Sequence, residues 1–238
     1  MIGVLLAAGV GSRLRPHTAD RPKCLLDIGG NTLLERTLRA FGAAGIDECV
    51  VVTGYLHRMI EEAAASYHLP LRVRFANNEL YETTNNNYSL WLAGRVTADS
   101  GILMMDADIL FEPRLLNTLI DSPYPDALII REGKMGKEEI KVELDGGRVR
   151  RIGKEIDPPR AAGESIGIEK FSPKTACSLF SILDRRKDRY EFYEASFQEL
   201  IDQGADLRTV SSGTMACMEI DTPEDLQEAR ILARSISA

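Results

Sequence analysis

Near the start of the chain, residues 2–23 read IGVLLAAGVGSRLRPHTADRPK. The segment opens with a short, continuous apolar run, Ile2 to Leu6, which stops at Ala-Ala-Gly. This pattern is typical of a strand that is buried on both faces of a parallel sheet and leads into a glycine-rich loop. Because ligands of such sheets bind beyond the carboxyl ends of the strands, the loop after Leu6 is the first candidate for a binding site.

Strand-like and helix-like segments alternate along the rest of the chain. Thr32 and Glu35 form a capping-box pattern, and apolar residues then recur at helical spacing until Gly45, so the first helix is predicted between them. Further strands are predicted at residues 49–53, 71–75, 101–105, 127–131, 140–144, 149–154, 165–171, 207–210 and 215–220. Further helices are predicted at residues 57–67, 88–93, 113–120, 173–183, 190–203 and 225–236.

This order of elements predicts the fold class. Alternating βα units need right-handed crossovers, which place helices on both faces of the sheet. We therefore predict one domain, residues 1–238, with a three-layer α/β/α architecture and a mixed, mainly parallel sheet. Asp145-Gly146-Gly147 is typical of a hairpin turn, and the strands around it, together with residues 127–131, predict a small antiparallel β insertion.

The composition excludes several classes of protein. Of the 238 residues, 44% are hydrophobic and 27% are charged, which is ordinary for a globular chain. The net charge of −7 is opposite to the basic footprint of a nucleic-acid binder, so no nucleic-acid partner is expected. The four cysteines lack the spacing of zinc ligands or of a disulfide framework. Neither a secretory signal pattern nor an apolar run long enough to span a bilayer is present, so we expect a cytoplasmic protein without a membrane partner.

The loop after the first strand is strongly basic. It carries one acid, Asp20, and four cations within eleven residues. The cations are Arg13, Arg15, Arg21 and Lys23. Small residues ahead of them, among which are Gly11 and Ser12, let backbone N–H groups approach a phosphate without a Cβ clash. The loop therefore predicts a polyphosphate site, although it matches neither the P-loop nor the dinucleotide fingerprint. A solvated basic loop is the alternative.

Two aspartates follow apolar strands at the edge where ligands bind. Asp108 closes the strand that ends in Asp-Ala-Asp, and Asp221 follows the strand at residues 215–220. Carboxylates that bridge Mg²⁺ to phosphates are an ordinary coordination for this ion. Thr222 and Pro223 already supply the cap and first turn of the last helix, which leaves Asp221 free for a ligand. A capping role for Asp108 before Pro113 is the alternative.

These motifs resemble a known family. Residues 6–16 with Arg21-Pro-Lys23 look like the N-terminal signature of the nucleoside-triphosphate transferases, best known as sugar-1-phosphate nucleotidyltransferases. Further matches are Gly54-Tyr55, Asp106-Ala-Asp108 and Glu219-Ile-Asp221-Thr-Pro-Glu-Asp. Residues 77–90 and Gly163-Glu-Ser-Ile-Gly-Ile168 are more similar to the branch that activates phosphocholine or 2-aminoethylphosphonate with CTP. The resemblance implies a Rossmann-like nucleotidyltransferase fold.

The resemblance also implies roles for individual residues. Arg13 is expected to bind the β- and γ-phosphates, and Lys23 the α-phosphate together with the acceptor. Asp108 and Asp221 are expected to hold Mg²⁺. The positions expected along the nucleotide are Ala7, Ala8, Gly9, Gly11, Ser12, Asn86 and Ser89. The Glu-Lys-Pro that holds the sugar phosphate in the family reads Gly153-Lys154-Glu155 here, so Lys154 is expected to keep that role in a different pocket.

The implied reaction is attack of a phosphate or phosphonate oxygen on the α-phosphorus of CTP, in line with departing pyrophosphate. The second pKa of a phosphate monoester is about 6, so the attacking oxygen is already anionic at neutral pH and needs no general base. The activation barrier arises because two anions must be brought together. Lys and Arg side chains and Mg²⁺, when correctly positioned, lower this barrier by stabilising the negative charge. Lys23 and Arg13 are therefore the predicted catalytic residues.

The acceptor site is predicted from aromatic and acidic residues. Tyr190, Tyr193 and Glu194 share a face of the helix expected at residues 190–203, and such a face can hold an ammonium group by cation–π and Coulomb attraction. Tyr81 and Glu164 are further candidates. A packed helix face with solvated acids is the alternative reading.

Several functions are compatible with these residues. The first is a Mg²⁺-dependent cytidylyltransferase that uses CTP and a small phosphorylated amine, and the second is a sugar-1-phosphate or inositol-1-phosphate nucleotidyltransferase. The third is a glycosyltransferase, since Asp106-Ala-Asp108 is also a DxD motif, but a nucleotide-sugar donor has no γ-phosphate for Arg13. The fourth is a catalytically silent protein of the same fold. The sequence decides neither the acceptor nor the oligomeric state.

Overall fold

The computed structural model describes residues 1–97, 99–186 and 189–236. The strands are β1 (Ile2–Ala7), β2 (Glu48–Thr53), β3 (Arg72–Asn77), β4 (Ile102–Asp106), β5 (Ile109–Phe111), β6 (Ala127–Arg131), β7 (Lys141–Asp145), β8 (Arg148–Gly153), β9 (Gly163–Phe171), β10 (Arg208–Ser211) and β11 (Cys217–Glu219). The helices are α1 (Leu33–Ala43), α2 (His57–Ser66), α3 (Asn86–Thr97), α4 (Arg114–Ile120), α5 (Pro173–Arg185), α6 (Glu194–Asp202) and α7 (Pro223–Leu232). Three short 3₁₀ helices complete the list: η1 (Ser12–Leu14), η2 (Lys23–Leu25) and η3 (Pro158–Arg160).

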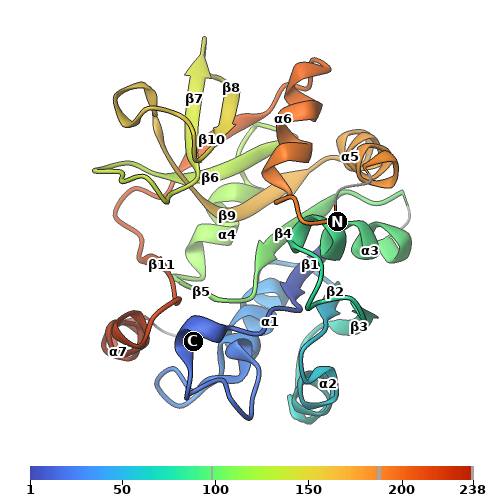
Figure 1. The fold of residues 1–238 in the computed structure, drawn as a ribbon, viewed down its shortest axis with the longest axis vertical. Helices are drawn as coiled ribbons and strands as arrows, with labels where there is room; N and C mark the ends of the chain where they lie inside the picture. The colour runs from blue at the N-terminus through green and yellow to red at the C-terminus, as the bar shows by residue number, and fades with distance from the viewer. Residues whose placement is uncertain (98, 187–188, 237–238) are drawn as a thin grey trace.

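The central sheet has the strand order β10-β6-β9-β4-β1-β2-β3. Its strands pair in parallel except for β9, which runs antiparallel to both β4 and β6. Strand β7 of the β7–β8 hairpin pairs antiparallel with the start of β9. Gly146 and Gly147 in the hairpin turn have φ 55° and 76°, which lie in the left-handed region that this type of turn requires. The predicted mixed, mainly parallel sheet and the antiparallel insertion are confirmed (Figure 1).

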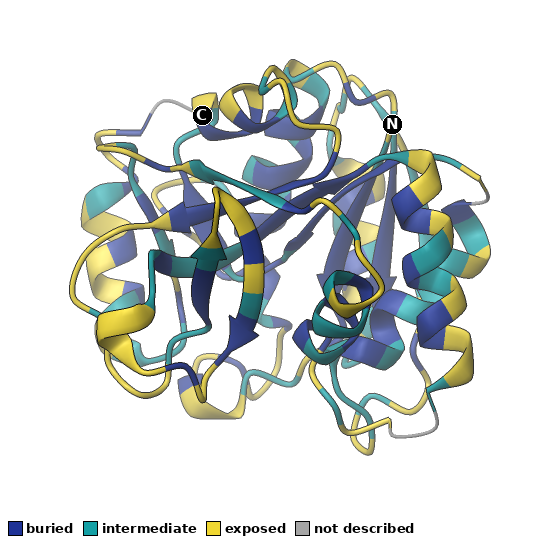
Figure 2. Ribbon diagram, turned by 90° about the horizontal axis from the view of Figure 1, so that it is seen from above, coloured by how far each residue is buried: buried dark blue, intermediate teal, exposed yellow. Residues whose placement is uncertain are grey.

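Helices cover both faces of the sheet because successive residues of each inner strand are apolar, so that both faces of the strand are apolar. On β1, Leu5 faces a core built with α1, α2 and α4, whereas Val4 and Leu6 face a core built with α3, α5 and α6. Figure 2 shows that the strands are mostly buried while the outer faces of the helices carry the exposed residues. The three-layer architecture is therefore confirmed.

A third, smaller core fixes the loop that follows β1. Leu14 is fully buried in it, together with Ile220 and residues of α7 such as Leu226 and Ala229. Burying a leucine contributes on the order of 2 kcal/mol, so this contact anchors the loop against the end of β11. Arg13, the residue before Leu14, is thereby brought to Asp221, which lies just before α7.

Three details differ from the sequence predictions. Residues 127–131 belong to the main sheet as β6 rather than to the insertion, because they pair with β9 and β10. Strand β5 was not predicted; its three residues are too short for a periodic signal, and they pair with β11 in a separate two-stranded sheet. Thr32 caps α1 as predicted, accepting from the Glu35 N–H at 3.1 Å, but the Glu35 carboxylate binds Arg39 instead of closing the capping box.

Among the helices of the described residues, none is both long and apolar enough to cross a membrane.

Candidate active site

Lys23 lies between the two aspartates that follow strands β4 and β11. Its ammonium nitrogen is 2.7 Å from Oδ2 of Asp108 and 2.8 Å from Oδ1 of Asp221. Arg13 approaches Asp221 from the other side, with 2.8 Å between Nη2 and Oδ2. Lys23 and Asp221, which are 198 positions apart in the sequence, are therefore joined in one ionic cluster. The structure brings together all four residues for which the sequence predicts catalytic or metal-binding roles.

The local fold explains this convergence. Lys23 begins the short helix η2, whose Cys24 and Leu25 are buried, so its backbone is fixed. Tyr55, which follows β2, donates from its hydroxyl to the carbonyls of Thr18 and Ala19 at 3.2 and 2.9 Å. These bonds tie the middle of the basic loop, residues 9–23, to the adjacent parallel strand and restrict where its cations can lie.

The electrostatics of the cluster follow from its partial burial. Burial lowers the pKa of Lys23, but the charges of Asp108 and Asp221 outweigh that effect and raise it above its ordinary value. Burial also raises the pKa of Asp221, and the charges of Lys23 and Arg13 overcome this and hold it below its usual range. The Lys23–Asp221 contact therefore joins two charged groups at neutral pH.

Glu219 is a third acid at the site, and it was missing from the residues predicted there. One oxygen from each of Asp108, Glu219 and Asp221 lies within 4.8 Å of the others. Burial first, and then the charges of the two aspartates, raise the pKa of Glu219 to about 8. The available signal was its position two residues before Asp221, since positions i and i+2 lie on the same side of an extended chain. Its place in an apolar strand pattern concealed it.

This carboxylate cluster, Asp108, Glu219 and Asp221, fits a hard divalent cation. Carboxylate oxygens are the ligands that Mg²⁺ prefers, and it binds them at about 2.1 Å. Oδ1 of Asp108 is buried and has no hydrogen-bond partner among the described residues. Buried polar atoms normally have a partner, and a bound cation would supply one here. Both observations suit Mg²⁺ better than a softer metal, because neither His nor Cys belongs to the cluster.

A cavity of about 230 Å³ opens beside the cluster at the carboxyl ends of β1 and β4. The residues that line it are Leu6, Ala8, Gly9, Asn78, Tyr81, Thr84, Asn85, Asn86, Ser89, Asp106, Asp108 and Glu219. Six of them, Ala8, Gly9, Tyr81, Asn86, Ser89 and Asp108, are residues for which the sequence predicts a binding role. The cavity is thus a continuation of the ionic cluster.

The other predicted nucleotide residues lie around the entrance formed by the basic loop. Ala7 ends β1 and is buried, and Gly11 and Ser12 lie at the start of η1. Gly11 has φ 63°, and a Cβ there would lie 3.3 Å from Cβ of Lys23. The glycine therefore supplies both the left-handed turn and the space for the lysine.

Two of the predicted residues that line the cavity form hydrogen bonds with other residues of the protein. Ser89 accepts a hydrogen bond from Asn78 at 3.1 Å, and the side-chain oxygen of Asn86 accepts from the backbone N–H of Tyr193 at 3.0 Å. Asn86 therefore links the nucleotide side of the cavity to the segment that was predicted to bind the acceptor.

That segment does not form the predicted helix, which is a correction. Helix α6 begins at Glu194, so Tyr190 lies outside it and is 70% exposed, while Tyr193 is buried. The reason is that Asn85 binds the carbonyls of Arg189 and Tyr190, at 2.7 and 3.1 Å, and these hydrogen bonds hold the backbone to the start of α3. The prediction that Tyr190, Tyr193 and Glu194 share one face of a helix is therefore wrong.

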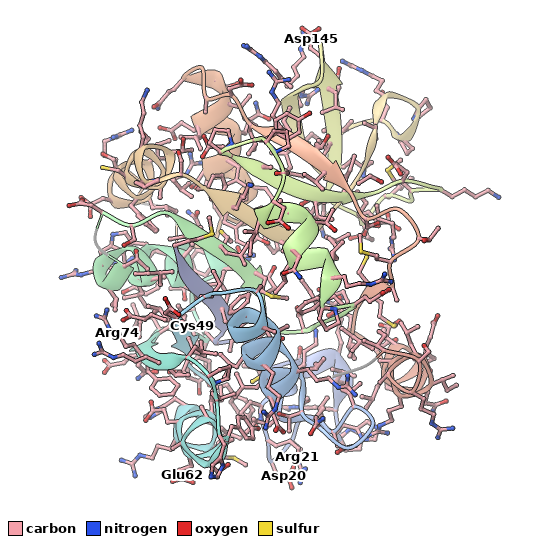
Figure 3. The ribbon with its side chains drawn as sticks, turned by 180° about the vertical axis from the view of Figure 1, so that it is seen from behind. Asp20, Arg21, Cys49, Glu62, Arg74 and Asp145 are labelled. Carbon is pink, nitrogen blue, oxygen red and sulfur yellow. The ribbon has the colours of Figure 1, made fainter. Side chains whose placement is uncertain are left out.

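The remaining acceptor candidates lie away from the cavity lining. Lys154 follows β8, places its ammonium 5.6 Å from the ring centroid of Phe192, and pairs with Glu138 at 3.4 Å. Glu164 on β9 pairs with Arg131 at 2.9 Å. The tip of the β7–β8 hairpin, marked by Asp145, lies at the opposite end of the molecule from Asp20 and Arg21 of the basic loop (Figure 3). Lys154 follows the other end of β8, and its charge partly offsets the rise that burial causes in the pKa of Glu194. Among the described residues, neither Lys154 nor Glu164 lines the cavity or pairs with a residue of the ionic cluster.

Asp106, which lines the cavity, belongs to a group of buried acids. Of this group, the sequence analysis did not single out Glu169. Asp106 is within hydrogen-bond distance of the Tyr193 hydroxyl, and Glu169 and Glu194 are buried nearby. Burial first, and then the neighbouring carboxylates, raise the pKa of both Asp106 and Glu169 well above their usual range. Both shifts favour the uncharged form of these carboxyls.

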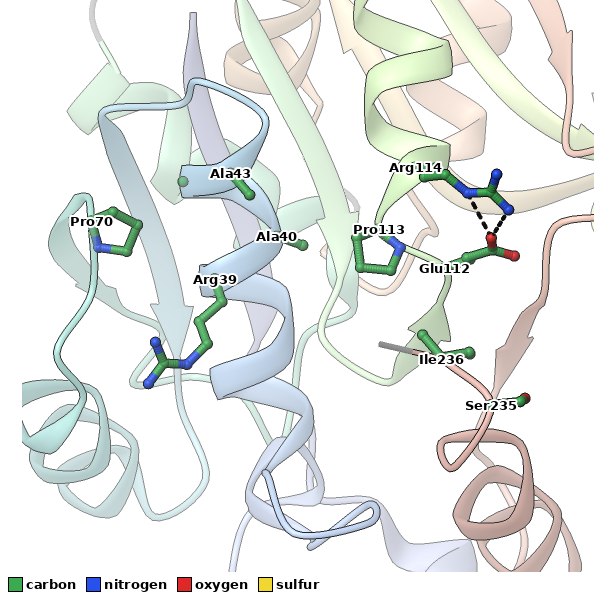
Figure 4. Close-up of a pocket in the computed structure, with 10 residues that line it drawn as sticks. Arg39, Ala40, Ala43, Pro70, Glu112, Pro113, Arg114, Ser235 and Ile236 are labelled. Carbon is green, nitrogen blue, oxygen red and sulfur yellow. Dashed lines mark hydrogen bonds and ion pairs between the residues drawn. The ribbon is translucent and has the colours of Figure 1, made fainter. Parts of the chain in front are cut away.

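A larger cavity of about 690 Å³ lies elsewhere, between α1, Pro70, the chain at residues 112–114 and the end of the described chain at Ser235 and Ile236 (Figure 4). Its charged residues include Arg114, which is paired with Glu112. None of the residues with predicted roles lines it. The ionic cluster and its smaller cavity are therefore the candidate active site.

Comparisons with known proteins identify the family of the chain. Residues 3–139 match the family described as the MobA-like NTP transferase domain. CMP-5'-(3-aminopropyl)phosphonate synthase of Streptomyces rubellomurinus is 28% identical over 237 residues, which cover 95% of this chain but only 38% of that protein. Choline-phosphate cytidylyltransferase of Streptococcus pneumoniae is 29% identical over 202 residues, which cover 84% of this chain and 83% of that protein.

The fold has a close counterpart among solved structures. The inositol-1-phosphate CTP transferase from T. maritima superposes with a TM-score of 0.84 at 22% identity, over 99% of this chain and 95% of that one. At this identity the likeness concerns the fold alone. The family match, however, covers more than half of the chain, including the basic loop and Asp108. The chain therefore belongs to the family of MobA-like NTP transferase domains and is a nucleotidyltransferase.

Proposed function

We propose that this protein is a Mg²⁺-dependent cytidylyltransferase that transfers CMP from CTP to a small phosphorylated amine and releases pyrophosphate. The observation that carries the proposal is the position of Lys23 between Asp108 and Asp221, with Arg13 beside them, at the edge of a polar cavity. In this arrangement the cationic side chains can bind the oxygens of a triphosphate, and the two carboxylates can bind the metal ion that accompanies it. The choice of CTP is supported by relatives that are named for cytidyl transfer.

The chain's own residues supply the charge that the reaction needs. Arg13 is 69% exposed at its side chain and can turn toward the outer phosphates, whereas the ammonium of Lys23 is only 12% exposed and lies deeper, where the α-phosphate and the acceptor meet. In the transfer, an acceptor oxygen bonds to the α-phosphorus as the bond to the bridging β-oxygen breaks. Lys23 stabilises the charge on the α-phosphoryl oxygens, and Arg13 stabilises the departing pyrophosphate.

Asp108 and Asp221, with Glu219 beside them, would hold the metal ion. When bound, Mg²⁺ supplies further neutralisation of the phosphate oxygens. The acceptor phosphate or phosphonate is already anionic at neutral pH, so no residue has to remove a proton from it.

An inositol or sugar phosphate is the second candidate acceptor. The observation that favours it is the absence of the predicted ammonium-binding helix face: Tyr190 is highly exposed, and Tyr193 is turned to Asp106 in the interior. An acceptor without a cationic group would need no such face.

The test is the rate of pyrophosphate release with CTP, UTP, GTP and dTTP, each combined with phosphocholine, 2-aminoethylphosphonate, inositol-1-phosphate and glucose-1-phosphate. We expect release with CTP and one of the two amines, and mass spectrometry should find the CMP adduct. Turnover only with glucose-1-phosphate, or only with a triphosphate other than CTP, would contradict the proposal.

A further inference from the structure

The two aspartates at the site are largely paired with cations of the protein itself. Lys23 contacts one oxygen of Asp108 and one of Asp221, and Arg13 contacts the second oxygen of Asp221. Of the four oxygens, the one that lacks a partner among the described residues is Oδ1 of Asp108. The protein therefore neutralises these carboxylates without a metal ion.

The ammonium nitrogen of Lys23 lies 2.7 and 2.8 Å from one oxygen of each aspartate, and Arg13 holds the second oxygen of Asp221. A divalent cation that bound both aspartates would therefore have to take an Asp221 oxygen that a cation of the protein already holds, directly beside the ammonium. Mg²⁺ would need oxygens at about 2.1 Å, and two cations so close together would also repel each other. Lys23 and the metal ion are therefore alternatives at this position.

We infer that Lys23 is a built-in counter-ion that competes with the divalent cation, and that a bound triphosphate opens the metal site by drawing Lys23 onto its phosphates. The inference rests on the proposed function only for the identity of that triphosphate. By linkage, a ligand that removes the competitor must strengthen metal binding, and the metal must strengthen triphosphate binding by the same factor.

The surroundings of Lys23 permit this exchange. Its backbone is fixed in η2, while its side chain is a flexible four-carbon chain that passes the Cβ-free face of Gly11. The lysine lies in the same loop as Arg13, which is exposed and can meet a phosphate first. A rotation of the side chain, without a movement of the loop, is therefore enough to transfer the ammonium from carboxylate to phosphate.

The test is the affinity for Mn²⁺ in the absence of nucleotide, measured by electron paramagnetic resonance for the wild-type chain and for Lys23→Met. Removing the ammonium should tighten Mn²⁺ binding by about tenfold or more, because the competing state is lost. Lys23→Gln serves as a second removal if the methionine variant folds poorly, and Lys23→Arg, which keeps the charge, should bind Mn²⁺ as weakly as the wild type. Arg72→Met, at an exposed arginine of β3 that is paired with Glu48 and has no predicted role, is the matched control and should leave the affinity unchanged.

Addition of CTP supplies the second readout. After the affinity of free CTP for Mn²⁺ is measured separately, CTP should strengthen Mn²⁺ binding in the wild type and do so much less in Lys23→Met. Equal Mn²⁺ affinities of the wild type and both lysine removals without nucleotide would overturn the inference. This outcome is distinct from failure of the proposed function, since it could occur in an active cytidylyltransferase, and an inactive wild type could still show the competition.

Discussion

The hydroxyl of Tyr193 donates a hydrogen bond to Oδ2 of Asp106 at 2.7 Å, and the backbone N–H of the same residue donates to Asn86 at 3.0 Å. Asp106 and Asn86 both line the cavity, so this one buried residue joins two of its walls. Gly167 leaves room for the contact: a Cβ there would lie 3.1 Å from Oδ2 of Asp106. Tyr193 therefore acts on the cavity through its neighbours rather than as a ligand.

Replacing Tyr193 with phenylalanine removes the hydroxyl but keeps the ring against Phe197. Asp106 is then a buried carboxyl without this donor, which costs about 1–3 kcal/mol of unfolding free energy. Urea denaturation measures the loss. Tyr124→Phe, at a surface tyrosine whose ring contacts Arg208, is the matched control and should change stability by no more than about 0.5 kcal/mol. Equal effects of the two substitutions would show that the Tyr193–Asp106 bond adds nothing.

Lys23→Ala should lower kcat by orders of magnitude, because the charge that stabilises the α-phosphoryl oxygens is lost. Far-ultraviolet circular dichroism should remain that of the wild type, since the backbone of η2 is held by buried neighbours. Arg72→Ala, at an exposed arginine that is paired with Glu48 and has no predicted role, is the control and should keep the wild-type kcat. Near-normal turnover of the lysine variant would remove Lys23 from the mechanism.

Asp108→Asn should weaken the metal dependence of the reaction. An amide is a poorer ligand for Mg²⁺ than a carboxylate, so the Mg²⁺ concentration that gives half-maximal rate should rise, by roughly tenfold. The titration is compared with that of Asp20→Asn, an exposed acid in the basic loop. A Mg²⁺ titration unchanged by the substitution at Asp108 would mean that this carboxylate is not a ligand.

Glu194 gives a prediction about pH. Burial raises the pKa of this carboxyl to about 7 in the folded protein, above its ordinary value of 4.5. The unfolded chain therefore loses the proton first as pH rises, and the folded state is penalised progressively between about pH 4.5 and 7. Glu194→Gln removes the penalty, so the stability of the variant relative to wild type should be higher at pH 8 than at pH 5, by about 3 kcal/mol.

The control for this prediction is Glu228→Gln, at an exposed position of α7. Its effect on urea unfolding should be the same at both pH values. If Glu194→Gln also shifted stability equally at pH 5 and pH 8, the Glu194 carboxyl would not be titrating in this range.

Much of the fold was predictable because its signals are local. The apolar run at β1 marks a strand, and the glycines at 146 and 147 mark a hairpin. The segment before α6 was not predictable in this way. Its aromatic and acidic pattern fits a helix, but hydrogen bonds to Asn85 and Asn86, more than 100 residues earlier, hold it in another conformation. Long-range contacts of this kind leave no periodic pattern in the sequence.

The site was predictable to a similar extent. Motifs at strand ends identified Lys23, Asp108 and Asp221, because the carboxyl ends of these strands and the basic loop converge in this fold. Glu219 was missed because it lies within an apolar strand pattern, although its position two residues before Asp221 places both acids on the same side of the chain. The prediction of the acceptor site depended on the directions in which side chains point. The position of Lys154 in the sequence does not determine the direction of its side chain.

The most direct test of the central claim is a crystal structure of the wild-type chain with CTP and Mn²⁺, with anomalous scattering recorded for the metal. We expect an anomalous peak in contact with Asp108 and Asp221, the triphosphate against the basic loop, and the ammonium of Lys23 on the α-phosphate. A nucleotide bound elsewhere, or a triphosphate that contacts neither Arg13 nor Lys23, would contradict the account.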